Sequence, residues 1–210
     1  MALTYPYSID FLAKCLAGPI IPLVLRRFDE MSGSADGRFW SAQLAPPLWE
    51  ASYSLYANHS AHAREINAKV QALDGVNKAI VWCDPYYAGP ASGVTAGLSG
   101  VTVSGIRADR GAVSLAGVPA GFVLTAGDFM SINYGGGRRY FGQFAEGGTA
   151  SGGSVPMAEI RPYLPIGIPT GAAVDLVKPR FNAVVTDFKP FANYRGKWGQ
   201  DAAITILQKR

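Results

Sequence analysis

The chain has 210 residues, of which 49% are hydrophobic and only 16% are charged, and it contains 25 glycines and 14 prolines. This composition excludes a disordered chain and is typical of short strands joined by tight turns. Two cysteines are too few for a disulfide-stapled mini-protein. The net charge is +4, and seven basic residues stand against two acidic ones after Val177. Because these charges are spaced among aromatic residues, we interpret them as a solvated face or a subunit contact rather than a nucleic-acid site.

Residues 1–25 are apolar enough to raise the question of a signal peptide. They lack a basic region at the start, contain Asp10 and Lys14 and hold three prolines, so we interpret them as part of the fold. No run of about 18 apolar residues occurs, and we therefore expect a soluble protein without a membrane span. Cys15 and Cys83 are predicted to be small buried residues.

The segment that follows predicts strands. One strand is expected around Ile20–Phe28, and one or two more are expected to flank a break at Ala45–Pro47. After the break, Trp49–Leu55 alternates apolar with polar residues, which gives one face that can be buried.

A single α-helix is predicted over about residues 61–74. Asn58 or Ser60 can cap its first N–H groups, and Gly75 can take the left-handed conformation that ends it. Its apolar stripe consists of Ile66, Val70 and Leu73. This spacing places the three side chains on one face, so the helix is expected to pack against a sheet.

The composition changes abruptly to a glycine-rich stretch after Asp84 and changes back after Pro165. Five short strand-like runs lie between these points, which is enough for a small barrel or sandwich. The later runs resemble those of the first segment. We therefore predict a mainly β fold with one α-helix. A discontinuous domain formed by residues 1–84 and 166–210 would contain the helix, and residues 85–165 would form an inserted small β-barrel domain.

No catalytic motif is recognisable in the sequence. A GxSxG elbow, a Walker A lysine and a GxGxxG turn after a strand are all missing. His59 and His62 lack a third ligand nearby, and we interpret them as surface or capping residues. The 15 acidic residues are scattered singly, so no carboxylate pair can be nominated, and Asp128 is interpreted as a turn residue. We predict a protein that is not an enzyme, with no catalytic residue, cofactor or metal.

Gly135–Arg139, with the sequence GGGRR, is predicted to be the tip of a hairpin. Arg138 and Arg139 could bind phosphate or carboxylate through their guanidinium groups, but a solvated turn is the favoured interpretation. Three of the four tryptophans lie in strand-like runs, where an aromatic residue ordinarily fills the core instead of stacking on a sugar.

Several short motifs occur in an order that resembles small tail-tip proteins of long-tailed bacteriophages, prophages and gene transfer agents. The motifs are TYPYSIDFL at Thr4–Leu12, RFDEMSG at Arg27–Gly33, APPLW at Ala45–Trp49, REINAKVQALDG at Arg64–Gly75 and LTAGDFMSI at Leu124–Ile132. The resemblance spans most of the chain. Its layout is similar to that of distal tail proteins.

The resemblance implies a tail-tube-like β domain of the sandwich or split-barrel type, with one helix and an inserted small barrel. It also implies a ring, expected to be a hexamer, that joins the tail tube to the hub or baseplate and the fibres. The partners would be further copies of the chain, the tail tube protein and hub or fibre proteins. DNA would be involved only by passing through the ring lumen. The protein would be assembled in the bacterial cytoplasm and located in the tail of a virion or phage-like particle.

Two other classes of function stay open at this point. A carbohydrate-binding module acting in host-surface recognition could use Tyr134, Tyr140 or Phe141 as stacking platforms. A glycan hydrolase would need an acid pair that the sequence does not reveal. For the assembly role, aromatic residues and arginines on strand edges and hairpin tips are expected to dominate the contacts. The candidate subunit-interface residues are Arg26, Arg27, Arg138, Arg139, Arg195 and Trp198.

Overall fold

The computed structural model of the chain describes residues 4–7, 12, 15–33, 36–194, 197–199 and 201–210. These residues are mainly strand with one α-helix, as the sequence predicts. They divide into two compact units, the first made of Met1–Tyr5, Asp10–Ala79 and Ala183–Lys209 and the second of Pro6–Ile9, Ile80–Asn182 and Arg210. Among the described residues, no helix has both the length and the apolar character needed to cross a membrane.

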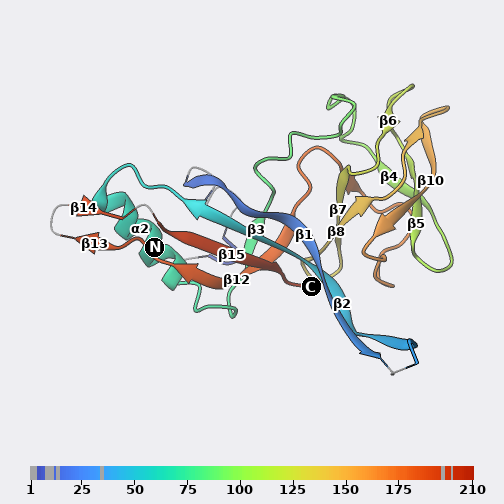
Figure 1. The fold of residues 1–210 in the computed structure, drawn as a ribbon. Coiled ribbons are helices and arrows are strands. Elements are labelled where there is room, and N and C mark those ends of the chain that lie inside the picture. The colour runs from blue at the N-terminus through green and yellow to red at the C-terminus, as the bar shows by residue number, and fades with distance from the viewer. Residues whose placement is uncertain (1–3, 8–11, 13–14, 34–35, 195–196, 200) are drawn as a thin grey trace. The chain divides into compact units, whose positions relative to one another are not determined.

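The first unit is built on an antiparallel sheet (Figure 1). The strands of the sheet, in spatial order, are β1 (Leu16–Gly33), β2 (Phe39–Leu55), β15 (Ala203–Gln208), β12 (Phe181–Lys189) and the short β3 (Ile80–Trp82). The short strands β13 (Asn193–Tyr194) and β14 (Lys197–Trp198) pair with each other. The predicted alternation at the end of β2 is confirmed, because Trp49, Ala51, Tyr53 and Leu55 are all buried. Burial of these side chains anchors β2 in the core of this unit.

The helix, α2, spans Ser60–Gln71. His59, rather than Asn58 or Ser60, is its N-cap, because the His59 Nδ1 accepts a hydrogen bond from the His62 N–H at 3.1 Å. The helix ends before the predicted Asp74, since Asp74 and Gly75 both take positive φ angles of 50° and 65°. Ile66, Val70 and Leu73 are buried, which confirms the predicted apolar stripe.

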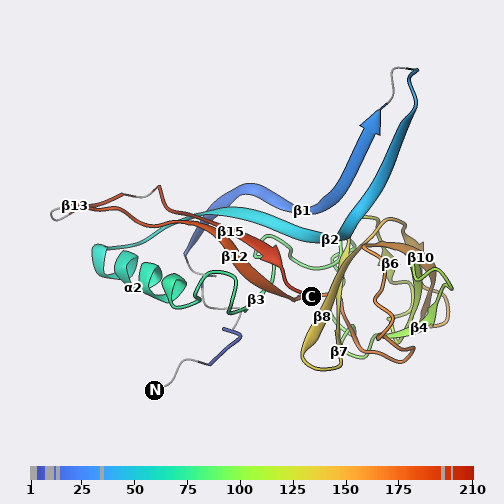
Figure 2. The same cartoon turned by 90° about the horizontal axis from the view of Figure 1, so that it is seen from below.

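The second unit contains a six-stranded sheet with the order β11-β7-β8-β10-β5-β4 and a small β6–β9 pair. The strands of these two sheets are β4 (Thr102–Ile106), β5 (Ala112–Ala116), β6 (Val123–Leu124), β7 (Phe129–Tyr134), β8 (Arg138–Phe144), β9 (Gly148–Thr149), β10 (Ser154–Arg161) and β11 (Val174–Asp175). The two ends of the sheet meet, because the Val103 N–H donates to the Ala172 carbonyl at 2.9 Å and the Gly171 N–H donates to the Val103 carbonyl at 2.7 Å. The sheet therefore closes on itself as a small barrel, whose strands surround a common interior in Figure 2.

The barrel interior is filled by apolar side chains from every strand of the closed sheet. They include Val103, Val113, Leu115, Met130, Ile132, Phe144, Val155, Ile160 and Val174. Two polar residues fix loops against this core. Asp128, 2% exposed, accepts hydrogen bonds from the Ala91 and Thr125 N–H groups at 2.8 and 2.9 Å, which confirms it as a turn residue. The Arg110 guanidinium donates to the carbonyls of Leu164, Pro165 and Ile168.

Candidate assembly interface on the β1–β2 arm

β1 and β2 form one long antiparallel hairpin, whose register runs from Leu16 opposite Leu55 to Gly33 opposite Phe39. The next strand of the sheet, β15, pairs with β2 only between Glu50 and Ser54. Farther out, the described residues of the two strands pair only with each other. We call residues 25–33 and 36–45 the arm, which Figure 2 shows extending beyond the other strands of its sheet.

The arm exists because β2 continues through two prolines. Arg26 pairs with Leu48 and Phe28 pairs with Ala45, so Pro46 and Pro47 fall at an irregularity in the register. A proline cannot donate a ladder hydrogen bond, and a bulge is one of the few places where a strand tolerates it. The break predicted at Ala45–Pro47 is therefore wrong, since the chain bulges there and remains a strand.

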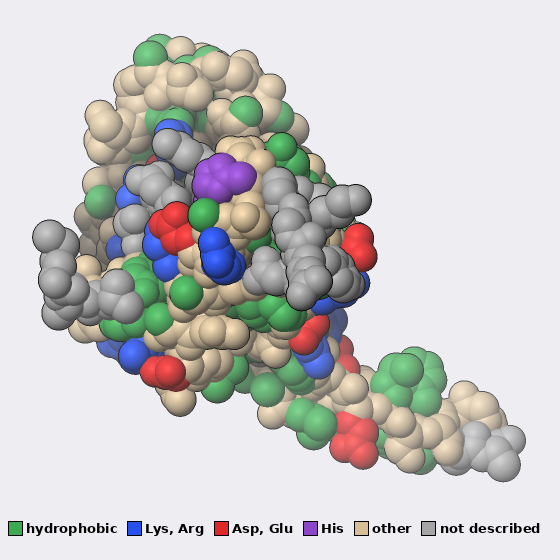
Figure 3. Space-filling view, turned by 90° about the vertical axis from the view of Figure 1, so that its left-hand side faces the viewer, with side chains coloured by type: hydrophobic (Ala, Val, Ile, Leu, Met, Phe, Trp, Pro, Cys, Tyr) green, Lys and Arg blue, Asp and Glu red, His purple; other side chains and the backbone are tan. Residues whose placement is uncertain are grey.

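Large apolar side chains on the arm face solvent. Met31 is 73% exposed, Phe39 71%, Trp40 64% and Leu44 68%. Consecutive residues of a strand point to opposite faces, so Phe39 and Trp40 place exposed aromatic surface on both sides of the hairpin. Figure 3 shows hydrophobic side chains on the surface of the arm. The expectation that strand tryptophans fill the core is wrong for Trp40, although Trp49 and Trp82 are buried.

Both backbone edges of the arm lack a neighbouring strand among the described residues. The first half of β1 is protected by Pro19 and Pro22, which remove N–H donors, but the part from Leu23 to Gly33 contains no proline. A two-stranded hairpin without further cover is marginally stable in water. An apolar arm with two open edges therefore has the properties of a surface that docks on another molecule.

The arm also carries charges of both signs, including the predicted interface residues Arg26 and Arg27. Arg26 donates to Glu50 at 3.1 Å and its guanidinium lies 5.2 Å from the centre of the Phe28 ring. Asp29 and Glu30 follow on the same strand and are exposed. Because both signs occur on one short segment, two copies of the arm can offer complementary charges to each other.

The other predicted interface residues lie away from the arm. Arg138 is exposed at the β7–β8 turn, where its Nε donates to the Gly135 carbonyl at 2.9 Å and its guanidinium lies 4.8 Å from the Tyr134 ring centre. This turn is the hairpin tip that the sequence predicts. Arg139 is half-buried in β8. Trp198 belongs to β14, and Arg195 lies outside the described residues.

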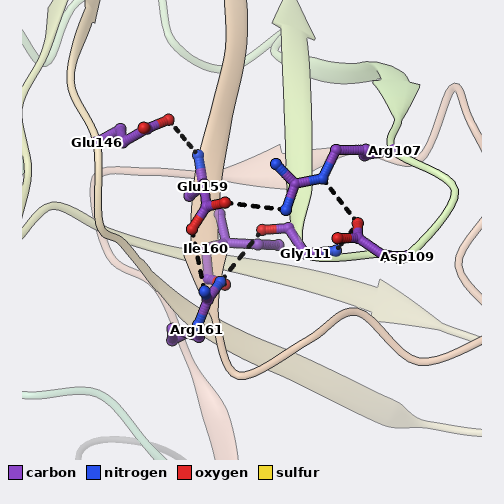
Figure 4. Close-up of polar contacts among 7 residues, drawn as sticks. All are labelled: Arg107, Asp109, Gly111, Glu146, Glu159, Ile160 and Arg161. Carbon is purple, nitrogen blue, oxygen red and sulfur yellow. Dashed lines mark hydrogen bonds and ion pairs between the residues drawn. The ribbon is translucent and has the colours of Figure 1, made fainter.

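An ion-pair network gathers three carboxylates near the β4–β5 turn (Figure 4). Glu159 contacts Arg107 at 2.9 Å and Arg161 at 3.0 Å, and Arg107 also contacts Asp109 at 2.8 Å. The Glu146 carboxylate accepts a hydrogen bond from the Glu159 N–H at 3.2 Å. Hydrogen bonding from Arg107 lowers the pKa of Asp109 to about 2 and also lowers the pKa of Glu159. These two carboxyl groups are therefore unsuited to donate a proton near neutral pH, and the network serves to hold the turn.

A cysteine and a histidine meet in the first unit. The Cys15 Sγ lies 3.5 Å from the His62 Nε2, and the His62 Nδ1 accepts a hydrogen bond from the Asn58 N–H. Burial raises the pKa of Cys15, which disfavours the nucleophilic thiolate. Cys15 is buried as predicted, whereas Cys83 is half-buried, and neither forms a disulfide. In the part of the chain that the structure describes, no group of three His, Cys, Asp or Glu residues could hold a metal ion.

No protein-family model matches this sequence, and a search of curated proteins returned no significant match. The geometry of the arm therefore carries the functional argument. The apolar residues on it, Met31, Phe39, Trp40 and Leu44, were missed as interface candidates. The adjacent aromatic residues Phe39 and Trp40 were the signal that could have revealed this surface. Neighbouring residues of a strand point to opposite faces, so when only one face is buried, one of the two aromatic side chains must be exposed.

Proposed function

We propose that this protein is a structural subunit of a phage-like tail tip, a ring-forming distal tail protein that connects the tail tube to the hub and fibres. The observation that carries the proposal is the arm, which exposes aromatic and aliphatic side chains on both faces. An arm of this kind is suited to insertion between neighbouring subunits, where both faces would be covered.

A second copy of the chain is the partner that the arm fits best. Its charges of both signs favour contact between like copies, and its open edges can extend a sheet from one copy to the next. A contact of one patch with a different patch of the next copy generates a ring when the rotation closes. The expectation of six copies, and of a place in a tail, comes from the sequence motifs, two of which lie on or next to the arm.

The alternative function, carbohydrate binding by stacking of aromatic rings on sugar rings, finds few accessible rings among the three residues predicted for it. Tyr140 is 3% exposed and Phe141 is fully buried, so neither ring can receive a sugar. Tyr134 is half-buried and has the Arg138 guanidinium over its ring. A glycan array tests this alternative independently of assembly.

Light scattering on the purified protein tests the assembly proposal. We expect a species of about six times the 22.3 kDa chain mass, in line with a closed cyclic assembly. Electron microscopy of particles carrying a tagged copy should place the label at the tail tip. A protein that stays monomeric at all concentrations and is missing from particles would overturn the proposal.

A further inference from the structure

The second unit contains a cavity of about 480 Å³ on the outside of the barrel wall. Its floor is the outer face of strands β11, β7 and β8, and its sides are the loop around Leu98 and the segment from Val177 to Arg180. This volume lies within the range of sites that hold small molecules. All of the lining residues belong to the second unit.

The strand register places polar side chains on the cavity floor. Asn133 pairs with Arg139, and Ser131 pairs with Asp175, so these four residues share the outer face of the sheet. Ile132, between Ser131 and Asn133, points instead into the barrel core. Arg180 lies at the side of the cavity, and its backbone N–H donates to the Ser131 Oγ at 2.9 Å.

The two arginines of the cavity have no anionic partner within the described residues. Among the residues that the structure describes, neither the Arg139 nor the Arg180 guanidinium forms an ion pair or a hydrogen bond, and the Arg180 Nε is buried without an acceptor. Burial, together with the positive charge of Arg180, lowers the pKa of Arg139. A buried guanidinium nitrogen without an acceptor is costly, and two neighbouring guanidinium groups repel each other. An anion placed between them would relieve both penalties.

Asp175 is the one acidic residue among the described residues that line the cavity, and it is hydrogen-bonded to the backbone. Asp175 Oδ1 accepts hydrogen bonds from the N–H groups of Val177 at 3.1 Å and Lys178 at 3.0 Å, which fixes the turn after β11. It forms no ion pair with Arg139 or Arg180 in the described part of the chain. The cavity thus keeps an excess of positive charge over its polar floor.

We propose that this cavity binds a small polar molecule through a carboxylate or phosphate group, held by Arg139 and Arg180. Guanidinium groups bind both oxyanions in a forked, charge-assisted geometry. Ser131 and Asn133 provide hydroxyl and amide groups for the polar remainder of the ligand. The site goes beyond the assembly role and does not depend on it, because it uses no residue of the arm.

Isothermal titration calorimetry on the full chain tests this site, with sodium phosphate, sodium glucuronate and glucose as probes at constant ionic strength. We expect saturable binding of one equivalent of phosphate or glucuronate per chain and no binding of glucose. The stronger of the two anions identifies which oxyanion the site prefers. No saturable heat with either anion, or equal binding of glucose, would overturn the proposal.

Four substitutions locate the site. Arg139→Gln and Arg180→Gln should each weaken anion binding by about tenfold or more, because each removes a charged hydrogen-bond donor. Asp175→Asn keeps the Oδ1 acceptor for the turn, removes a negative charge and should tighten binding. Arg138→Gln, on the neighbouring tip residue outside the cavity, is the matched control and should leave binding unchanged. Should Arg180→Gln fail to fold, Arg139→Gln and Asp175→Asn decide, and wild-type affinity in both would place the anion elsewhere and refute the proposal.

Discussion

Removing the two exposed aromatic side chains of the arm should weaken assembly and spare the fold. The double substitution Phe39→Thr and Trp40→Thr clears one aromatic from each face of the hairpin, and threonine keeps the preference for strand. Phe39 is 71% and Trp40 is 64% exposed, so neither contributes much to the core of the subunit. We expect the free energy of unfolding to change by about 0.5 kcal/mol or less, as for other surface substitutions.

The expected loss of association follows from the exposed area. An aromatic side chain can bury about 150–250 Å², so each of these two has on the order of 100–160 Å² left to cover. At about 25 cal/mol per Å², this area is worth about 2–4 kcal/mol for each residue as an upper bound. Because ordering costs reduce the net gain, we expect a loss of about 3 kcal/mol for the pair, or a dissociation constant about a hundredfold weaker.

Analytical ultracentrifugation over a range of concentrations measures this loss, and urea unfolding of each variant measures the fold. Val76→Thr is the matched control, because Val76 is 56% exposed but lies outside the arm. It should leave both association and stability unchanged. Unchanged association of the double variant, with its fold intact, would refute the reasoning that the arm is the assembly surface.

Three further predictions concern the second unit. Arg110→Lys should lower the unfolding free energy by about 1–3 kcal/mol, because an ammonium group cannot reach all three carbonyls of Leu164, Pro165 and Ile168 at once. The urea midpoint should fall, and an unchanged midpoint would show that these hydrogen bonds do not stabilise the fold. Asp128→Asn replaces one of the two acceptor oxygens by an NH2 group, so the amide proton of either Ala91 or Thr125 should exchange faster; unaltered exchange at both residues would count against this role. The pKa of Asp109 is lowered to about 2, so its stabilising effect is complete above about pH 4 and lost as pH falls toward 2. Asp109→Asn should flatten this acid dependence, and a slope equal to that of the wild type would argue against the ion pair with Arg107.

The sequence predicted those parts of the fold that local spacing controls. The stripe of Ile66, Val70 and Leu73 identified the helix, and Gly135–Arg139 identified a hairpin tip, because both depend on residues that are neighbours in the chain. The cap was misplaced by one residue, since a histidine ring nitrogen replaced the more common hydroxyl or amide acceptor.

Features that depend on pairing between distant segments could not be predicted. Proline signals a break in isolation, yet Pro46 and Pro47 lie within a continuous strand because the register with β1 bulges there. Arg139 was recognised as a possible anion ligand, but its partner Arg180 comes from a segment that reaches the same cavity only through the pairing of β11 with β7. No local pattern links these two arginines.

The two sheets differ in whether they have free edges, and this difference assigns assembly to the first unit and ligand binding to the second. The second unit closes its six strands into a barrel, because the first and last strands of that sheet are joined by hydrogen bonds, and closure removes the edges on which another chain could add a strand. The first unit leaves the arm with two unpaired edges and exposed apolar side chains on both faces. The first unit can therefore pair its arm with a strand of another copy. Side chains on the outer surface of the barrel can be substituted without disturbing a subunit contact made by the arm. On this reasoning, substitutions in the Arg139 and Arg180 cavity should change ligand binding while leaving association intact, and substitutions on the arm should do the reverse.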